Sequence, residues 1–239
     1  MKVVYQNIIN SVTSGKKLLA VLIDPDKMTL KNVPSFISKL NQSVASHIFI
    51  GGSTVGENAT GILVEAIKTH TQLPVILFPG DVNQITNTAD GLLFLSLISG
   101  RNPEYLIGKH VESISKLSKT NLEVISTGYV LIESGKETAV ERVTKTKPLN
   151  NIQEIADTVK AGELLGMKLM YLEAGSGAIN PISSEIIIKV KAGIKIPLIV
   201  GGGIRTKLQL ELAYKSGADL VVIGTAFEED ESFFDDLKK

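Results

Sequence analysis

The chain has 239 residues, 44% of them hydrophobic, and its 25 basic and 25 acidic side chains cancel. This length fits one α/β barrel domain over residues 1–239, and the neutral charge balance argues against a nucleic-acid partner. Cysteine is absent, which excludes disulfides and thiolate chemistry and suits a reducing cytoplasm. No apolar run approaches the roughly 20 residues of a membrane span, and residues 1–17 lack the apolar block of a signal peptide.

Short apolar segments rich in β-forming residues recur along the chain, separated by stretches long enough for a helix. Most of them do not alternate with polar residues, which is typical of parallel strands buried on both faces. Eight such strands in one domain favour a closed (β/α)8 TIM barrel over an open sheet. The predicted strands are 18–23, 47–50, 74–78, 92–95, 122–126, 169–172, 196–200 and 220–223.

Four of the intervening segments have the apolar spacing of amphipathic helices, namely 35–40, 58–69, 152–165 and 207–214. Gly166 follows the third of them and is a typical helix stop.

The crossover between the third and fourth strands has a composition that disfavours a helix. It contains Pro79, Gly80, two asparagines and Gly91. A crossover needs about a dozen residues including its helix, and this one barely reaches that length. We therefore predict that helix 3 of the barrel is truncated or replaced by irregular chain.

The longest predicted loop, 128–148, follows the fifth strand and carries a basic segment at 142–147. Loops after barrel strands lie at the catalytic face, so this loop is either a lid or substrate clamp or an ordinary solvated loop. Near the end of the chain, Phe233 and Phe234 are candidates for an apolar surface.

Glycine-rich turns follow the last three predicted strands, at 173–177, 201–203 and 224–225. Glycine lets the backbone approach an anion and present its N–H groups, and barrel phosphate sites are commonly built from the loops after strands 7 and 8. The alternative is that these glycines only permit tight turns. Because the turns follow three successive strands, we predict a phosphate site.

Glu173 ends the sixth predicted strand beside this phosphate site and is the candidate catalytic base. A carboxylate near a bound anion has a raised pKa, because like charges disfavour ionisation, and a raised pKa helps it accept a proton near neutral pH. The alternative is a carboxylate that caps a turn or pairs with a lysine.

Oxygen-bearing side chains follow the first two strands. Asp24 and Asp26 flank Pro25, and Ser53 follows the second strand. Such groups can bind Mg²⁺, which prefers oxygen ligands and usually keeps several waters. For Asp26 we favour a helix cap over a metal ligand, and for Ser53 the two roles are equally open.

Three further residues receive structural interpretations. His47 and His110 have no companion at metal-ligand spacing, so we expect them to pack or to face solvent. Arg205 either pairs with the phosphate or opens the helix after strand seven, and we favour the helix start.

Five segments resemble the geranylgeranylglyceryl phosphate synthase family, which includes the bacterial heptaprenylglyceryl phosphate synthases. They are LIDPDK (22–27), FIGGST (49–54), YLEAGSG (171–177), IVGGGIR (199–205) and VIGTAF (222–227). They extend from the first strand to the eighth, so the resemblance covers essentially the whole chain. YLEAGSG with the two later segments is specific, whereas GGGIR alone occurs in many phosphate-binding barrels.

The resemblance implies a prenyltransferase that joins sn-glycerol 1-phosphate to a long prenyl diphosphate in a Mg²⁺-dependent step, making the first ether bond of archaeal-type lipids. Glu173 matches the residue proposed to activate the glycerol hydroxyl, and Asp24 and Ser53 match the Mg²⁺ positions. The positions that match the glycerol-phosphate site are Tyr171, Leu172, Glu173, Ala174, Gly175, Ser176, Gly177, Gly202, Gly203, Gly224 and Thr225.

The resemblance also implies a homo-oligomer, a dimer or a hexamer, and a lipid substrate suggests transient contact with a membrane surface. Candidates for a groove that holds the prenyl tail are Tyr129, Leu131 and Ile132, although we favour ordinary barrel packing for these residues.

The chain departs in two features from the pattern of some family members. Leu22 stands where some bacterial members have a lysine, so a phosphate or diphosphate contact must come from elsewhere, such as Lys27. The form YLEAGSG resembles archaeal and Bacteroidetes-like members, which favours a C20 geranylgeranyl donor over a C35 donor.

Two other functions stay open on the sequence. One is another phosphate-binding TIM-barrel enzyme of the sugar-phosphate isomerase or synthase type, against which YLEAGSG and the short third crossover argue. The other is a non-catalytic binder of phosphate ligands.

Overall fold

The structure is a computed structural model that describes residues 3–52, 55–56 and 58–238. Ser53, one of the two predicted metal ligands, lies outside the described residues.

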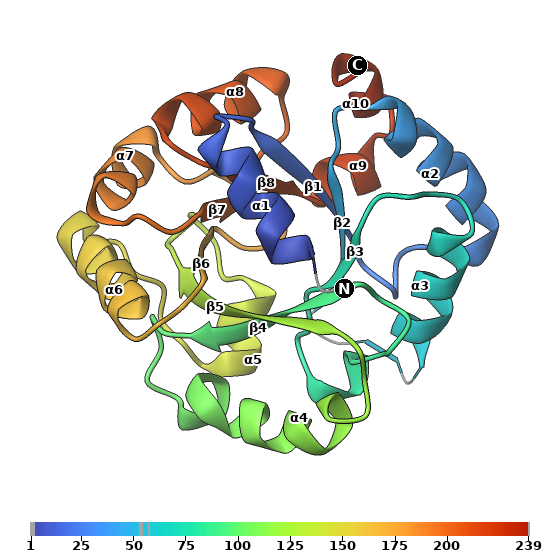
Figure 1. Cartoon of the computed structure of the whole chain (residues 1–239). Helices are drawn as coiled ribbons and strands as arrows, with labels where there is room; N and C mark the ends of the chain where they lie inside the picture. The colour runs from blue at the N-terminus through green and yellow to red at the C-terminus, as the bar shows by residue number, and fades with distance from the viewer. Residues whose placement is uncertain (1–2, 53–54, 57, 239) are drawn as a thin grey trace.

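Eight parallel strands follow one another around a closed barrel, and β1 pairs with β8 to close it (Figure 1). This confirms the predicted (β/α)8 TIM barrel. The strands are β1 (Leu18–Ile23), β2 (His47–Ile50), β3 (Val75–Leu77), β4 (Gly91–Leu97), β5 (Glu123–Leu131), β6 (Leu169–Glu173), β7 (Leu198–Gly201) and β8 (Leu220–Ile223).

Helices surround the barrel, and each of the four predicted helices is present with its ends within two residues of the prediction. The helix starts follow local chemistry: Asn151, Ser183 and Thr206 each accept a hydrogen bond from a first-turn N–H group. The helices are α1 (Val4–Thr13), α2 (Val33–Gln42), α3 (Ala59–Lys68), α4 (Lys109–Leu117), α5 (Ala139–Thr144), α6 (Ile152–Leu164), α7 (Ser184–Gly193), α8 (Lys207–Ser216), α9 (Thr225–Glu229) and α10 (Phe233–Asp236), with the 3-10 turns η1 (Leu30–Asn32) and η2 (Val82–Gln84) and the π-helical turn η3 (Glu104–Gly108).

The strands are buried on both faces, as their continuous apolar runs predicted. Side chains that point inward, such as Phe49 and Leu93, form one cluster inside the barrel. Those that point outward, such as Ile48 and Leu92, form a second cluster against the helices. None of the described helices is long and apolar enough to span a bilayer.

Helix α1 lies across one end of the barrel, in front of the strands in Figure 1, and was not predicted. Val4 and Ile8 are buried in the inner cluster. The Glu123 carboxylate at the start of β5 accepts the N–H groups of Val4 and Tyr5 at 2.6 and 3.1 Å. These contacts close the amino-terminal end of the barrel, so the opposite end is the open mouth.

The prediction that the third barrel helix, the one expected after β3, is truncated or replaced is confirmed. Only the single 3-10 turn η2 lies between β3 and β4, whereas α3 is the helix that follows β2. The buried side chain of Gln84 holds this irregular segment in place. Its amide nitrogen donates to the Gly52 carbonyl at 2.8 Å, and its amide oxygen accepts from the Gly80 N–H at 3.2 Å. One glutamine therefore ties together the loops after β2 and β3 without a covering helix.

Two sequence interpretations are wrong in part. The predicted loop 128–148 begins too early, because β5 continues to Leu131 in register with β4 and β6, and the later part contains α5, which starts with a Thr138–Glu141 capping box. Phe233 and Phe234 are buried against Phe227, so they do not form an apolar surface.

Candidate active site

A pocket of about 360 Å³ opens at the carboxyl ends of the strands, where TIM-barrel enzymes place their active sites. Its two sides differ in chemistry. The polar end, from β1 and the loops after β6, β7 and β8, consists of Asp24, Lys27, Glu173, Ser176, Arg205, Thr225 and Glu228. The apolar arm, from η2, β4, η3 and α5, consists of Val82, Leu93, Phe94, Leu95, Tyr105, Val140 and Val143.

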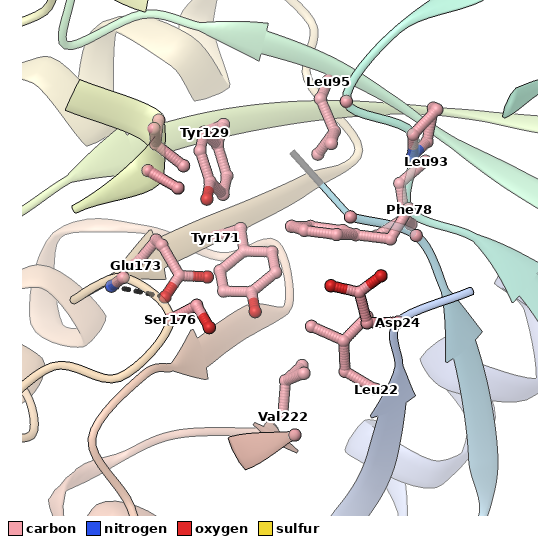
Figure 2. Close-up of a pocket in the computed structure, with 18 of the residues that line it drawn as sticks. Leu22, Asp24, Phe78, Leu93, Leu95, Tyr129, Tyr171, Glu173, Ser176 and Val222 are labelled. Carbon is pink, nitrogen blue, oxygen red and sulfur yellow. Dashed lines mark hydrogen bonds between the residues drawn. The ribbon is translucent and has the colours of Figure 1, made fainter. Parts of the chain in front are cut away.

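Glu173 lies at the inner wall of the polar end and is only 6% exposed. Its Oε1 accepts the N–H of Gly175 at 2.6 Å, the bond drawn as a dashed line in Figure 2. Burial raises the pKa of the Glu173 carboxyl, and the Gly175 N–H bond partly offsets this effect. The raised pKa agrees with the sequence argument, but its main cause is burial and not a neighbouring anion.

Two tyrosines face Glu173 from inside the barrel. Tyr129 and Tyr171 are register partners on β5 and β6, and both line the pocket. Burial, with the Glu173 charge second, raises the pKa of both phenols well above their ordinary value, so both stay protonated. The Tyr171 hydroxyl is buried beside the Glu173 carboxylate but makes no hydrogen bond of ordinary geometry with a described residue, which leaves its donor available to a ligand.

Glycines make room for these groups at the barrel mouth. A Cβ atom on Gly201 would lie 2.3 Å from the Tyr171 hydroxyl, and a Cβ atom on Gly202 would lie 2.7 Å from Glu173 Oε1. Gly202 also has φ +87°, a backbone conformation that residues with a side chain rarely adopt. Any side chain at either position would therefore displace Tyr171 or the candidate base.

The structure brings the three predicted glycine turns together. The pocket is lined by Tyr171, Glu173, Gly175, Ser176, Gly202, Gly203, Gly224 and Thr225, and Ser176 Oγ lies 3.5 Å from Thr225 Oγ1. Three predicted site residues do not line it. Leu172 and Ala174 point outward into the core beneath the helices, and Gly177 approaches Lys136. The alternation of side chains along a strand explains the outward position of Leu172.

Asp24 follows β1 at the edge of the polar end. Its Oδ1 accepts the Asp26 N–H at 3.0 Å, and Lys27 Nζ lies 4.0 Å from Oδ2 and 2.7 Å from a Glu228 oxygen. Burial raises the pKa of the Asp24 carboxyl. Within residues 3–52, 55–56 and 58–238, no three His, Asp or Glu side chains gather closely enough to hold a metal by themselves.

Of the interpretations of Asp26 and Arg205, the first is wrong and the second is confirmed. Asp26 is not a helix cap: its carboxylate accepts the Gly56 N–H at 3.2 Å, and η1 begins only after Thr29. Arg205 precedes the first turn of α8, as favoured, and its guanidinium donates to the Ala178 carbonyl at 2.8 Å.

Both histidines pack. Burial, followed by the nearby Lys16 charge, lowers the pKa of His47 to about 4, and His110 packs against the edge of the Phe94 ring. Of the tail candidates, Tyr129 lines the pocket, whereas Leu131 and Ile132 belong to the packed core.

Phe78 and the leucines of the apolar arm line the pocket but were missed in the sequence. Phe78 directly follows the short strand β3, and its place just past a strand end was the available signal. Leu93 and Leu95 gave no signal, because only the tilt and register of β4 decide which of its apolar side chains face the pocket.

Comparisons with known proteins agree with the motif resemblance. The PcrB family profile matches residues 11–239. A geranylgeranylglyceryl phosphate synthase of Zunongwangia profunda is 57% identical, over 94% of this chain and 96% of that protein. The synthase of Pyrococcus abyssi is 41% identical over 95% of this chain and 90% of its own length. The crystal structure of (S)-3-O-geranylgeranylglyceryl phosphate synthase from Thermoplasma acidophilum with sn-glycerol-1-phosphate has a TM-score of 0.93 and 30% identity, covering 99% and 96% of the two chains.

Burial of Glu173 predicts a pH-dependent stability difference. A carboxyl whose pKa is raised by folding supports the folded state at low pH and loses that contribution as pH rises through its folded pKa. Glu173→Gln removes the charge but keeps an acceptor for the Gly175 N–H. We expect the variant to match the wild type at pH 4 and to be more stable at pH 8, by about 1 kcal/mol or more.

Urea unfolding at several pH values measures this difference. Glu65→Gln, at an exposed position of α3, is the matched control and should show no such trend. A Glu173→Gln difference that stays constant from pH 4 to pH 8 would contradict the interpretation.

Proposed function

Because the chain belongs to the PcrB family, we propose that it is a prenyltransferase joining sn-glycerol 1-phosphate to geranylgeranyl diphosphate, with geranylgeranylglyceryl phosphate as product. The observation that carries the proposal is the position of Glu173, buried where a polar pocket end meets an apolar arm. A lipid donor and a phosphorylated acceptor need these two environments side by side.

The glycine turns after β6, β7 and β8 are suited to hold the phosphate of the acceptor. Gly175, Gly202 and Gly203 have φ values of +99°, +87° and +72°, and all three line the polar end. Such turns direct backbone N–H groups toward an anion. A phosphate fixed there would orient the glycerol hydroxyl toward the barrel centre, where Glu173 lies.

Glu173 is proposed as the base that takes the proton of the attacking glycerol 3-hydroxyl. Burial raises the pKa of the Glu173 carboxyl towards neutral pH, and this favours proton transfer to it in the transition state. The unpartnered Tyr171 hydroxyl lies in the same wall and is available to donate to the acceptor.

Mg²⁺ is the proposed cofactor, with Asp24 and Ser53 as candidate ligands. The described part of this site fits: a Cβ atom on Gly52 would lie 2.8 Å from Asp24 Oδ1, so the bare glycine keeps space open beside the carboxylate. One or two carboxylates suffice for Mg²⁺ when substrate phosphates complete its coordination. The bound ion would neutralise charge on the departing diphosphate. Lys27, which reaches Asp24 and Glu228, is the candidate second contact to the diphosphate.

The apolar arm is the proposed site of the prenyl tail. Leu93 and Leu95 of β4, Val140 and Val143 of α5 and Tyr105 of η3 line it. Because only the turn η2 lies between β3 and β4, no full helix covers this side of the mouth within the described residues. The C20 donor, self-association as a dimer or hexamer and transient membrane contact stay predictions from the family resemblance.

An incubation of the purified protein tests the proposed reaction. With Mg²⁺, radiolabelled sn-glycerol 1-phosphate and C15, C20 or C35 prenyl diphosphates, we expect organic-extractable label, most of it with the C20 donor. Reactions without a donor are the control. No extractable label with any donor would instead favour another phosphate-binding barrel enzyme or a non-catalytic binder.

Replacement of the proposed base separates turnover from binding. Because its role is in the transition state, Glu173→Gln should lower kcat about 100-fold or more. Calorimetry should show that sn-glycerol 1-phosphate still binds within a few-fold of the wild-type affinity. A rate close to wild type would remove Glu173 from the base role.

Replacement of the proposed metal ligand should change the response to magnesium. We expect Asp24→Asn to raise the Mg²⁺ concentration for half-maximal rate about tenfold or more. Asp26→Asn, two residues away and exposed, is the matched control and should leave that concentration unchanged. An equal effect of both substitutions would argue against a specific role of Asp24.

A further inference from the structure

Three aromatic rings meet in the base of the pocket. The ring centroids of Phe78 and Tyr171 are 5.3 Å apart, those of Tyr129 and Tyr171 are 5.3 Å apart, and those of Phe78 and Tyr129 are 5.8 Å apart. All three residues line the pocket. We call this group the aromatic floor (Phe78, Tyr129 and Tyr171).

The barrel itself sets this arrangement. Tyr129 and Tyr171 are paired in register on neighbouring strands, and Phe78 follows β3 across the barrel mouth. Tyr171 is fully buried and Tyr129 is 6% exposed, so both rings are held by packing. Leu22, Leu93 and Val222, which line the pocket next to these rings, are aliphatic.

The aromatic floor lies beside the two charged ends of the proposed reaction. In the view of Figure 2, Tyr171 lies between the Glu173 carboxylate and the Asp24 carboxylate, and Phe78 lies beside Asp24. The proposed base acts on the acceptor hydroxyl at one end, and the diphosphate is expected at the other. In the proposed reaction, the carbon that changes partners passes between these two ends and therefore next to the aromatic floor.

We infer that Phe78 and Tyr129, together with Tyr171, stabilise positive charge on the allylic carbon during transfer, an inference that rests on the proposed function. In that step the bond from C1 of the prenyl group to a diphosphate oxygen breaks, and its electron pair leaves with the diphosphate. A glycerol oxygen forms the new C–O bond, and its proton passes to Glu173. Between the two events C1 and C3 of the allyl group carry positive charge.

The geometry suits a cation–π interaction. A cation is attracted to the face of an aromatic ring when it lies within about 6 Å of the ring centroid. The centroids are 5.3 to 5.8 Å apart and the ring planes are tilted by 45° to 85° to one another, so a carbon roughly 4 Å from their centre lies within about 6 Å of all three centroids. An aliphatic floor would exclude water equally well but would offer the cation no negative ring face. The floor therefore favours the transition state over the neutral ground state.

Fluorination of Phe78 tests the inference, because each added fluorine weakens the negative ring face with little change of shape. We expect mono-, di- and trifluorophenylalanine at position 78 to lower kcat stepwise, to about tenfold in total. The matched control is the same series at Phe49. Its ring is buried, stacks near Phe78 at 6.4 Å and does not line the pocket, so kcat should not change.

A pair of substitutions at Tyr129 separates the ring from the hydroxyl. Tyr129→Phe keeps the ring and should retain most of the activity, whereas Tyr129→Leu should lower kcat about tenfold. Binding provides a second readout without turnover: with Mg²⁺ and inorganic diphosphate present, trifluorination at position 78 should weaken a prenyl ammonium analogue about tenfold. The affinity for the neutral prenyl alcohol should stay unchanged.

The outcomes distinguish failure of the aromatic floor's proposed role from failure of the proposed function. If the unsubstituted protein forms product but its kcat does not respond to fluorination at Phe78, or responds equally at Phe49, the inference is wrong and the proposed function stands. If the unsubstituted protein forms no product from any prenyl diphosphate, the proposed function fails and the inference fails with it.

Discussion

A carboxylate buried inside a barrel mouth destabilises the folded chain unless nearby groups offset the lost hydration. Glu173 is in this position, and the hydrogen bond from the Gly175 N–H, followed by the nearby Tyr171 and Tyr129 hydroxyls, partly offsets the cost. The burial of Glu173 and Tyr171 explains why two neighbouring positions are glycine. Gly202 must lack a side chain because Glu173 Oε1 occupies that space, and Gly201 must lack one because the Tyr171 hydroxyl does.

The same burial connects stability with chemistry. A carboxyl group in water would be fully ionised at neutral pH and a weak proton acceptor, whereas burial raises its pKa. The neighbouring phenols stay protonated, so the Glu173 carboxyl is the group in this wall whose proton affinity suits a base. The fold therefore has a local energetic cost at the position where the proposed reaction moves a proton.

The irregular segment between β3 and β4 also depends on one buried polar side chain, that of Gln84. A barrel normally covers each strand pair with a helix, but here Gln84 replaces that cover with hydrogen bonds to Gly52 and Gly80. Apolar residues of β4 then line a pocket at the mouth together with Val140 and Val143 of α5. The proposed function places a long apolar group on this side of the mouth, while the glycine turns line the polar end of the pocket.

The sequence by itself determined the eight strands, the missing helix and the three glycine turns, because apolar periodicity and glycine content are local properties of the chain. It also identified Glu173 and Asp24, since both directly follow or end a strand at the mouth. Only the tertiary structure decided that α1 closes the opposite end, that Leu172 points away from the pocket, and that Phe78, Tyr129 and Tyr171 meet. These features depend on strand register, strand tilt and contacts between residues far apart in the chain, which no local pattern encodes.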